Sequence, residues 1–171
     1  MKTIIINSPK HGIKEVLIDD DIYPFVIHWK WGIQKHKNSF YCKRAIRRNG
    51  LSVSIKLHRF IFGETDTAIL IDHIDHNGLN CQMSNMRRAN HSQNAANRKS
   101  AQGRSSKYLG VSIKTIKDKK LKKEYKYWHA QLKYGNKIIS FGYFKDEVLA
   151  AQAYDEGAKK YHKEFANLNF K

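Results

Sequence analysis

Residues 69–100 of the chain read ILIDHIDHNGLNCQMSNMRRANHSQNAANRKS. It holds three histidines and six asparagines, with an apolar run leading in and a basic run leading out. Asparagine favours turns, because its short amide side chain bonds to the nearby backbone. Asp72 and His73, however, are residue types that bind cations and transfer protons. The stretch is therefore either a set of turns or a site that binds a cation and transfers protons.

The net charge indicates a polyanionic partner. The 171 residues include 32 Lys and Arg against 15 Asp and Glu, which gives a formal charge of +17. A nucleic acid fits this excess better than an acidic membrane surface does, and a basic ribosomal-type protein is a further alternative. Hydrophobic residues make up 41% of the chain and aromatic residues 12%, which favours a folded protein over a disordered basic tail.

Cysteine usage and hydropathy exclude several classes of protein. Cys42 and Cys81 form no Cys-x-x-Cys pair, so we expect no zinc and no disulfide scaffold. The opening MKTIIINSPK has too short an apolar run for a signal peptide, and no run reaches membrane-spanning length. We therefore expect a cytoplasmic protein without a membrane partner.

Strand patterns dominate both ends of the chain. In residues 1–60, TIIIN, EVLID, FYCKRAIR and LSVSIKLH are typical of strands, and WKWG supplies large anchors for a small core. Near the C-terminus, YLGVSI, YKYWHAQLKY and KIISFGYF predict three strands with a hairpin turn at YGNK. The following DEVLAAQAYDEGAKKYH has helical spacing, and Asp146 is a good N-cap. The prediction is an α+β fold with a domain over 1–99, a basic linker over 100–107 and a domain over 108–171.

The middle stretch predicts a strand, a loop, a second strand and a short helix. AILID is the first strand and NMRRA (85–89) the second. Asn90 and Gln93 form a capping-box pattern for a helix over 91–98, which would place Asn94 and Arg98 one turn apart on one face. This order of elements brings Asp72, His73 and Asn94 within reach of one another.

Those three side chains suit metal-assisted hydrolysis. The oxygen ligands of Asp72 and Asn94 fit a hard cation such as Mg²⁺ or Mn²⁺. A neutral His73 fits a general base, because its pKa lies near neutrality. Together they could hydrolyse a phosphodiester, with the metal stabilising charge on the phosphate. On spacing alone, turn formation by a solvated Asp-His pair remains the competing interpretation.

The segments LHRFIFG and IDHIDHNGLNCQMSNMRRANHSQNAANR resemble the HNH homing endonucleases of phages and introns, whose core is the ββα-metal fold. The resemblance covers roughly 14–99. We therefore expect a nuclease domain over 1–99, made of a small β-rich region over 1–56 and the ββα-metal core over 57–99. It implies that His73 is the general base, that Asp72 and Asn94 bind the metal and that Asn85 orders the loop and fixes the histidine. The third letter is Asn94 instead of histidine, so the chain would be an H-N-N variant. A bacterial or phage-infected host cell is the implied setting.

Other polar residues near this core have less specific roles. His58, in the Leu-His-Arg segment, and His91, at the start of the helix, are candidates for support beside the metal site. Phosphate contacts are expected from the neighbouring basic residues Arg87, Arg88, Arg98, Lys99 and Lys107.

The C-terminal stretch from YLGVSI to ANLNF is similar to the plant Apetala/ethylene-response-factor DNA-binding domain, over about 106–170. That family packs a three-stranded antiparallel sheet on one helix, and the sheet enters the major groove. Strand alternation agrees, because Trp128, Ala130 and Leu132 would face the helix while the residues between them face DNA. Position by position, the family's contacts and this parity indicate Leu109, Ser112, Lys114, His129, Gln131, Lys133, Ile138 and Ser140. Gln131 could pair with adenine, and Ile138 could meet a thymine methyl group.

Two classes of function follow from these patterns. The first is a site-specific, metal-dependent double-stranded DNA endonuclease, a monomer that mainly nicks because one site attacks one strand at a time. The second is a DNA-binding regulator without catalysis. A further DNA-contacting sheet is our hypothesis for residues 1–56.

Overall fold

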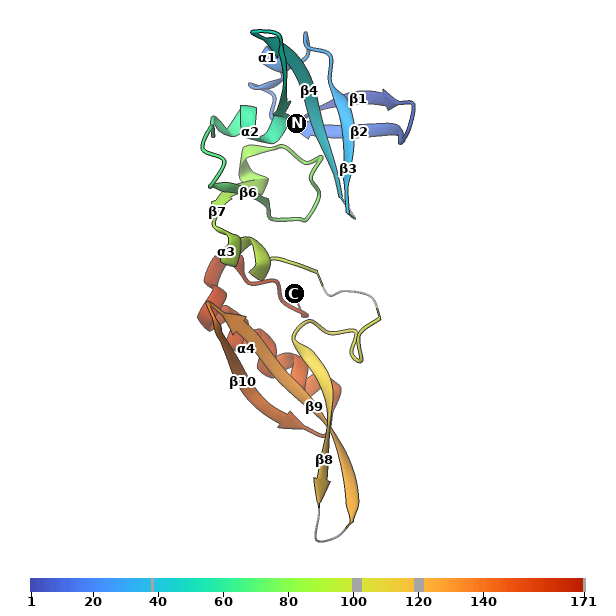
Figure 1. The fold of residues 1–171 in the computed structure, drawn as a ribbon, viewed down its shortest axis with the longest axis vertical. Helices are drawn as coiled ribbons and strands as arrows, with labels where there is room; N and C mark the ends of the chain where they lie inside the picture. Colours follow the sequence, from blue (N-terminus) through green and yellow to red (C-terminus); the bar gives the residue numbers. More distant parts are fainter. Residues whose placement is uncertain (38, 100–102, 119–121, 171) are drawn as a thin grey trace. The chain divides into compact units, whose positions relative to one another are not determined.

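The computed structural model describes residues 1–37, 39–99, 103–118 and 122–170 and has an α+β fold (Figure 1). Contacts divide the chain into two compact units, Met1–Asn90 and His91–Lys171, and each unit is described by itself. Of the predicted linker, residues 100–102 lie outside the described residues and the rest belong to the second unit. The division into a nuclease domain and a DNA-binding domain stays a prediction.

The first unit begins with a hairpin that builds half of its core. β1 (Lys2–Ser8) and β2 (Gly12–Ile18) pair antiparallel with Ile4 opposite Val16. Alternate side chains of a strand share one face, so Ile4 and Ile6 from β1 are buried together with Val16 and Ile18 from β2. These residues form one hydrophobic cluster with side chains from later elements.

A three-stranded sheet and two short helices complete this core. The sheet is β3 (Gly32–His36), β4 (Ser39–Arg48) and β5 (Leu51–Lys56) in that order, and α1 (Tyr23–Val26) precedes it. The predicted strand LSVSIKLH is wrong at its end, because Leu57 and His58 open the helix α2 (Leu57–Phe62). In the helix, the side chains of Leu57 and His58 are both buried, and Leu57 joins the hydrophobic cluster.

The first unit ends with a small hairpin. β6 (Leu70–His73) and β7 (Met86–Ala89) pair antiparallel, and the short 3-10 helix η1 (Met83–Asn85) leads into β7. Both predicted strands are confirmed, each beginning one or two residues later than expected. Met86 is part of the hydrophobic cluster of the first unit, and Ile71 packs against it.

The second unit is a three-stranded sheet with one helix against it (Figure 1). After α3 (His91–Ala96), the strands β8 (Val111–Asp118), β9 (Lys123–Tyr134) and β10 (Lys137–Phe144) form an antiparallel sheet with β9 in the centre. The helix α4 (Glu147–His162) begins at the predicted cap, since Asp146 Oδ1 accepts a hydrogen bond from the Leu149 amide at 2.9 Å. The short η2 (Lys163–Phe165) follows.

Packing between this sheet and α4 follows the predicted alternation. Ala130 and Leu132 are buried, and Trp128 packs against the same cluster, as do Ile139 and Phe141 of β10. Their partners on α4 are the small side chains of Ala150, Ala151 and Ala158 together with the buried Tyr154 ring. Gly157 is required there, because a Cβ atom at this position would lie 2.1 Å from the Phe141 ring. None of the helices in the described ranges combines the length and apolar character needed to span a bilayer.

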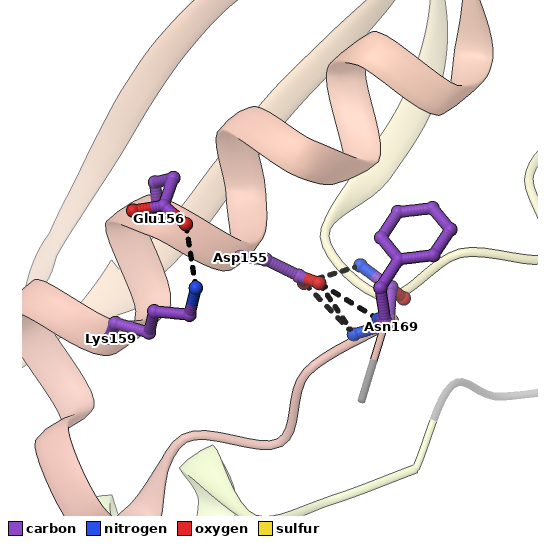
Figure 2. A network of polar contacts seen from close by, with 5 residues as sticks. Asp155, Glu156, Lys159 and Asn169 are labelled. Carbon is purple, nitrogen blue, oxygen red and sulfur yellow. Dashed lines mark hydrogen bonds and ion pairs between the residues drawn. The ribbon is translucent and has the colours of Figure 1, made fainter.

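A buried carboxylate fastens the C-terminal segment to α4. Asp155 is 4% exposed, and its oxygens accept hydrogen bonds from the amides of Asn169 and Phe170 and from the Asn169 side chain, at 2.9–3.0 Å (Figure 2). Asn169 in turn bonds the Leu109 amide at 2.7 Å and the Leu109 carbonyl at 3.1 Å. One carboxylate thus ties the helix, the C-terminal segment and the chain just before β8 together.

We predict that Asp155→Asn destabilises the second unit by about 2 kcal/mol, because a buried amide cannot accept all of these bonds and leaves donors unsatisfied. The neighbouring Glu156→Gln is the matched control, since Glu156 makes only an exposed ion pair with Lys159 at 2.6 Å (Figure 2). An exposed pair of this kind contributes less than about 1 kcal/mol. Urea unfolding of both variants checks this, and equal effects would contradict the prediction.

Candidate active site

The β6–β7 hairpin holds the Asp-His pair at the end of its first strand. Asp72 lies opposite Arg87 and His73 opposite Met86 in the antiparallel register. Asp72 and His73 are 5% and 6% exposed, so both polar side chains are enclosed by protein. Burial of an ionisable pair is costly unless each member is well paired, which distinguishes these two residues from a solvated turn.

Arg87 holds the Asp72 carboxylate. Its Nε and Nη2 atoms lie 2.9 Å and 2.8 Å from the same oxygen, Oδ2. The guanidinium is itself mostly covered, with 17% of the Arg87 side chain exposed, so the pair is only weakly screened by water. Arg87, which the sequence predicted as a phosphate contact, is therefore engaged by the predicted metal ligand.

Two aromatic rings flank His73. The His58 ring stands perpendicular to it, at 89° with ring centroids 5.1 Å apart, and the Tyr41 ring lies 6.0 Å away. Tyr41 and His58 also contact each other edge to face at 5.6 Å. Tyr41 comes from β4 and His58 from α2, so two other elements fix where the imidazole of His73 on β6 lies. His58 thus lies beside His73, whereas no sequence pattern indicated Tyr41.

Burial keeps both imidazoles neutral. It lowers the pKa of His58 to about 3, with smaller contributions from the charges of His73, Lys56 and Arg59. Burial also lowers the pKa of His73, against the carboxylates of Asp75 and Asp72, which raise it. A neutral imidazole is the form that can accept a proton.

The loop 74–85 is closed by hydrogen bonds between Asp75 and Asn85. The Asn85 side chain donates to Asp75 Oδ1 at 2.9 Å and to the Asn80 carbonyl at 2.9 Å, and it accepts from the Asp75 amide at 3.1 Å. Asp75 also accepts from the Asn77 amide and the Asn80 side chain, both at 2.8 Å. Although burial opposes it, these bonds hold the pKa of Asp75 below its ordinary value.

The N-terminal strands anchor the same loop. The Leu17 amide bonds the Leu79 carbonyl and the Cys81 amide bonds the Leu17 carbonyl, both at 2.9 Å. Asp19 accepts from the Met83 amide at 2.7 Å and from the Gln82 side chain at 3.2 Å. Within the N-terminal region, β2 and Asp19 therefore support the loop that follows His73, a role that sequence reasoning missed.

Gly78 is the point of closest approach in this support. A Cβ atom there would lie 2.5 Å from the Phe40 carbonyl oxygen and 2.7 Å from the Tyr41 ring, so only glycine fits. The NG pair at 77–78 is a turn signal that could have located this contact.

Basic residues beside the site hold neighbouring loops. Arg59 donates through Nη1 to the Ile69 carbonyl at 2.8 Å and through Nη2 to the Asp66 carbonyl. Glu64, 8% exposed, receives Arg88 Nε at 3.0 Å, although 63% of the Arg88 side chain is exposed. The Arg88 side chain is thus largely exposed to solvent, although its guanidinium forms an ion pair with Glu64.

The second predicted metal ligand lies in the other unit. Asn94 is an exposed residue of α3, whereas Asp72 and His73 belong to the first unit. The predicted helix 91–98 is wrong at its end, because α3 stops at Ala96 and Arg98 lies beyond it. Among the described residues, no three His, Cys, Asp or Glu side chains are grouped to hold a metal ion. The oxygens of Asp72 and Asn94 nevertheless match the donor chemistry of Mg²⁺ and Mn²⁺.

The predicted reading face of the second unit is partly closed. Lys114, Lys133 and Ile138 are exposed, the last at 69%. His129, however, is 6% exposed, because it stacks on Tyr143 at 4.5 Å and shares a 2.8 Å hydrogen bond with Ser140. An irregularity between Ser140 and Gly142 sets Tyr143 opposite His129, which no sequence pattern indicated.

The remaining predicted contacts are distributed over the second unit. His91, Arg98, Lys99 and Lys107 are exposed, Gln131 and Ser112 are half-buried, and Leu109 is buried in the core. No protein-family model, curated protein or solved structure significantly matches this chain.

We predict that His58 makes the first unit acid-sensitive. Its folded pKa of about 3 lies below the ordinary 6.5, so the unfolded chain alone gains this proton as the pH falls from 6.5 towards 3. The contribution of His58 to the free energy of unfolding is therefore fully present above pH 6.5. Below pH 6.5 this free energy decreases by roughly 1.4 kcal/mol per pH unit. His58→Phe keeps a ring and removes the proton site, so we expect it to flatten this dependence by about 2 kcal/mol between pH 6 and 4.5.

Urea unfolding followed by tryptophan fluorescence measures this change. In a Trp128→Phe background the remaining tryptophans, Trp29 and Trp31, report on the first unit alone. His28→Phe is the control, since His28 is exposed on the same unit. Parallel stability curves for wild type and His58→Phe would contradict the prediction.

Proposed function

We propose that the protein is a site-specific, metal-dependent DNA endonuclease of the HNH type. The observation that carries the proposal is the enclosed pair Asp72 and His73 at the end of β6, beside a loop closed by Asp75 and Asn85. A carboxylate next to a neutral imidazole supplies a ligand and a base at one place. The resemblance of the sequence to HNH enzymes and the charge of +17 support the same function.

In this proposal His73 accepts the proton of the attacking water. Tyr41 and His58 fix the orientation of its ring, so the ring loses little rotational freedom when the phosphate binds. Asn85 keeps the loop after β6 closed and so holds the His73 backbone. Asp72 would be one ligand of Mg²⁺ or Mn²⁺, which would neutralise charge on the phosphate and the leaving oxygen. Asn94 stays the second ligand that the resemblance of the sequence implies.

The second unit would select the DNA sequence. Its sheet presents Lys114, Lys133 and Ile138 on the face opposite α4, which suits phosphate contacts and an apolar contact to a base. Because His129 and Ser140 bond each other, we propose that they shape this face instead of contacting bases.

One observation favours a second candidate, a DNA-binding protein without catalysis. The Arg87 guanidinium binds the Asp72 carboxylate through two nitrogens, which competes with a metal ion for the same group. An enzyme must release or share this carboxylate when the metal binds, whereas a regulator can keep the ion pair permanently.

We predict that the wild type converts supercoiled plasmid to open circles before linear DNA appears, and that His73→Ala slows this step by roughly 10²–10⁴-fold while DNA affinity is kept. A general base acts in the chemical step and contributes little to binding. The plasmid carries candidate target sequences, and Mg²⁺ and Mn²⁺ are tested separately. His28→Ala, on an exposed histidine of the same unit, is the control and should cut normally.

Near wild-type cutting by His73→Ala would refute the assignment of the base. Tight DNA binding by the wild type without any cleavage in either metal would support the regulator.

We also predict that EDTA abolishes cutting and that Asp72→Asn mimics metal removal, because an amide oxygen is a poorer ligand for a hard cation than a carboxylate. Glu64→Gln is a matched control, since Glu64 is equally buried and pairs with Arg88, the residue after Arg87. The rate against Mg²⁺ concentration is measured for each variant, and circular dichroism verifies folding. Equal losses in the two variants would show that Asp72 acts only through the stability of the hairpin.

A further inference from the structure

A groove on the first unit is lined by basic residues that have no role in the candidate site described above. It lies where the turn between β1 and β2 meets the strands β3 and β4, and it encloses about 440 Å³. Its polar walls are Lys10, His11, Gln34, Lys35, Lys37 and Lys43. No acidic residue lines it.

The four lysines have no counterion in the described part of the chain. None of them takes part in an ion pair there. Glu15 is the acidic residue of the adjoining hairpin, and its neighbour Val16 is buried in the core. Because neighbouring residues of a strand point to opposite faces, Glu15 points away from the core-facing side of β2. Like charges that converge without compensation lower stability, so their grouping calls for an anion from outside.

The Phe40 ring contacts one of these lysines and two neighbouring basic side chains. The Lys35 ammonium lies 5.9 Å from the centre of the Phe40 ring, and the ammonium of Lys14 lies 4.9 Å from it. The His11 ring meets Phe40 edge to face at 5.4 Å. Phe40 thus holds basic side chains from both hairpins on one partly covered surface, which reduces the freedom they would lose on binding an anion.

We propose that this groove binds successive phosphates of a DNA duplex and anchors the first unit on the flank of its target. Four lysines spread over three segments suit a chain of phosphates better than a single small anion, because lysine contacts phosphate as a point charge. The groove is open to solvent, as contact with a duplex backbone requires. The choice of DNA as the polyanion rests on the proposed function. The suitability of the groove for phosphate groups follows from its lysines alone.

The test uses the full-length protein, a 30-base-pair duplex of mixed sequence and fluorescence anisotropy in EDTA. Phosphate contacts are independent of sequence, and their number sets the slope of log affinity against log salt, about 0.9 per contact. We expect Lys35→Gln/Lys43→Gln to reduce this slope by about 1.8 and to weaken binding roughly thirtyfold at 0.15 M salt, which follows from that slope. The independent pair Lys10→Gln/Lys37→Gln should do the same.

Lys145→Gln/Lys160→Gln is the matched control. It removes the same charge from exposed lysines at and beside α4, and we expect the slope to stay close to wild type. Circular dichroism confirms that each double variant is folded. The proposal is overturned if the groove variants have the slope of the control, or if they lose binding to phosphatidylserine vesicles while keeping that of the duplex. Because EDTA prevents cutting, a wild type that never cleaves plasmid would remove the proposed nuclease function and leave the groove result intact.

Discussion

The structure of the first unit depends on the hydrogen bonds that join β2 to the loop after β6. Leu17 bonds the loop at Leu79 and Cys81, and Asp19 bonds it two residues further on. A loop of twelve residues would otherwise have to be ordered by its own contacts, at a large cost in backbone entropy. With one side fixed to a strand, the bonds between Asp75 and Asn85 need only close the other side.

This arrangement explains why the candidate site needs most of the unit. His73 is positioned by Tyr41 from β4 and His58 from α2, while Asp72 is held by Arg87 from β7. Each of these contacts comes from a different element, and the elements share one hydrophobic cluster. A mutation in that cluster therefore affects the orientation of Asp72 and His73 as well as the stability of the unit.

Elements with strong local signals were predictable from the sequence. The alternation of Trp128, Ala130 and Leu132 determined which face of β9 meets α4, and the cap at Asp146 gave the start of that helix. The turn at Tyr134–Lys137 follows from its glycine, which has φ of 59°.

Features that depend on distant contacts were not predictable. LSVSIKLH has the alternation of a strand, yet Leu57 and His58 enter a helix, because the core can bury both side chains there. The pairing of Asp72 with Arg87 requires knowledge of the strand register, and the irregularity at Ser140 changes which side chain meets His129. For the candidate site, the sequence indicated Asp72, His73 and Asn85 but not Tyr41, Asp75 or Asp19, whose roles come from other elements.

The two cysteines have a practical consequence. Cys42 and Cys81 lie fully inside the core of the first unit, and burial raises the pKa of both thiols, that of Cys81 to about 12. Thiolate is the reactive form, so both side chains are inert towards maleimides in the folded protein. A cysteine introduced on the surface of each unit would then be the sole target for a fluorophore pair. Energy transfer between the two dyes would report how far apart the units lie in solution, without removal of a native residue.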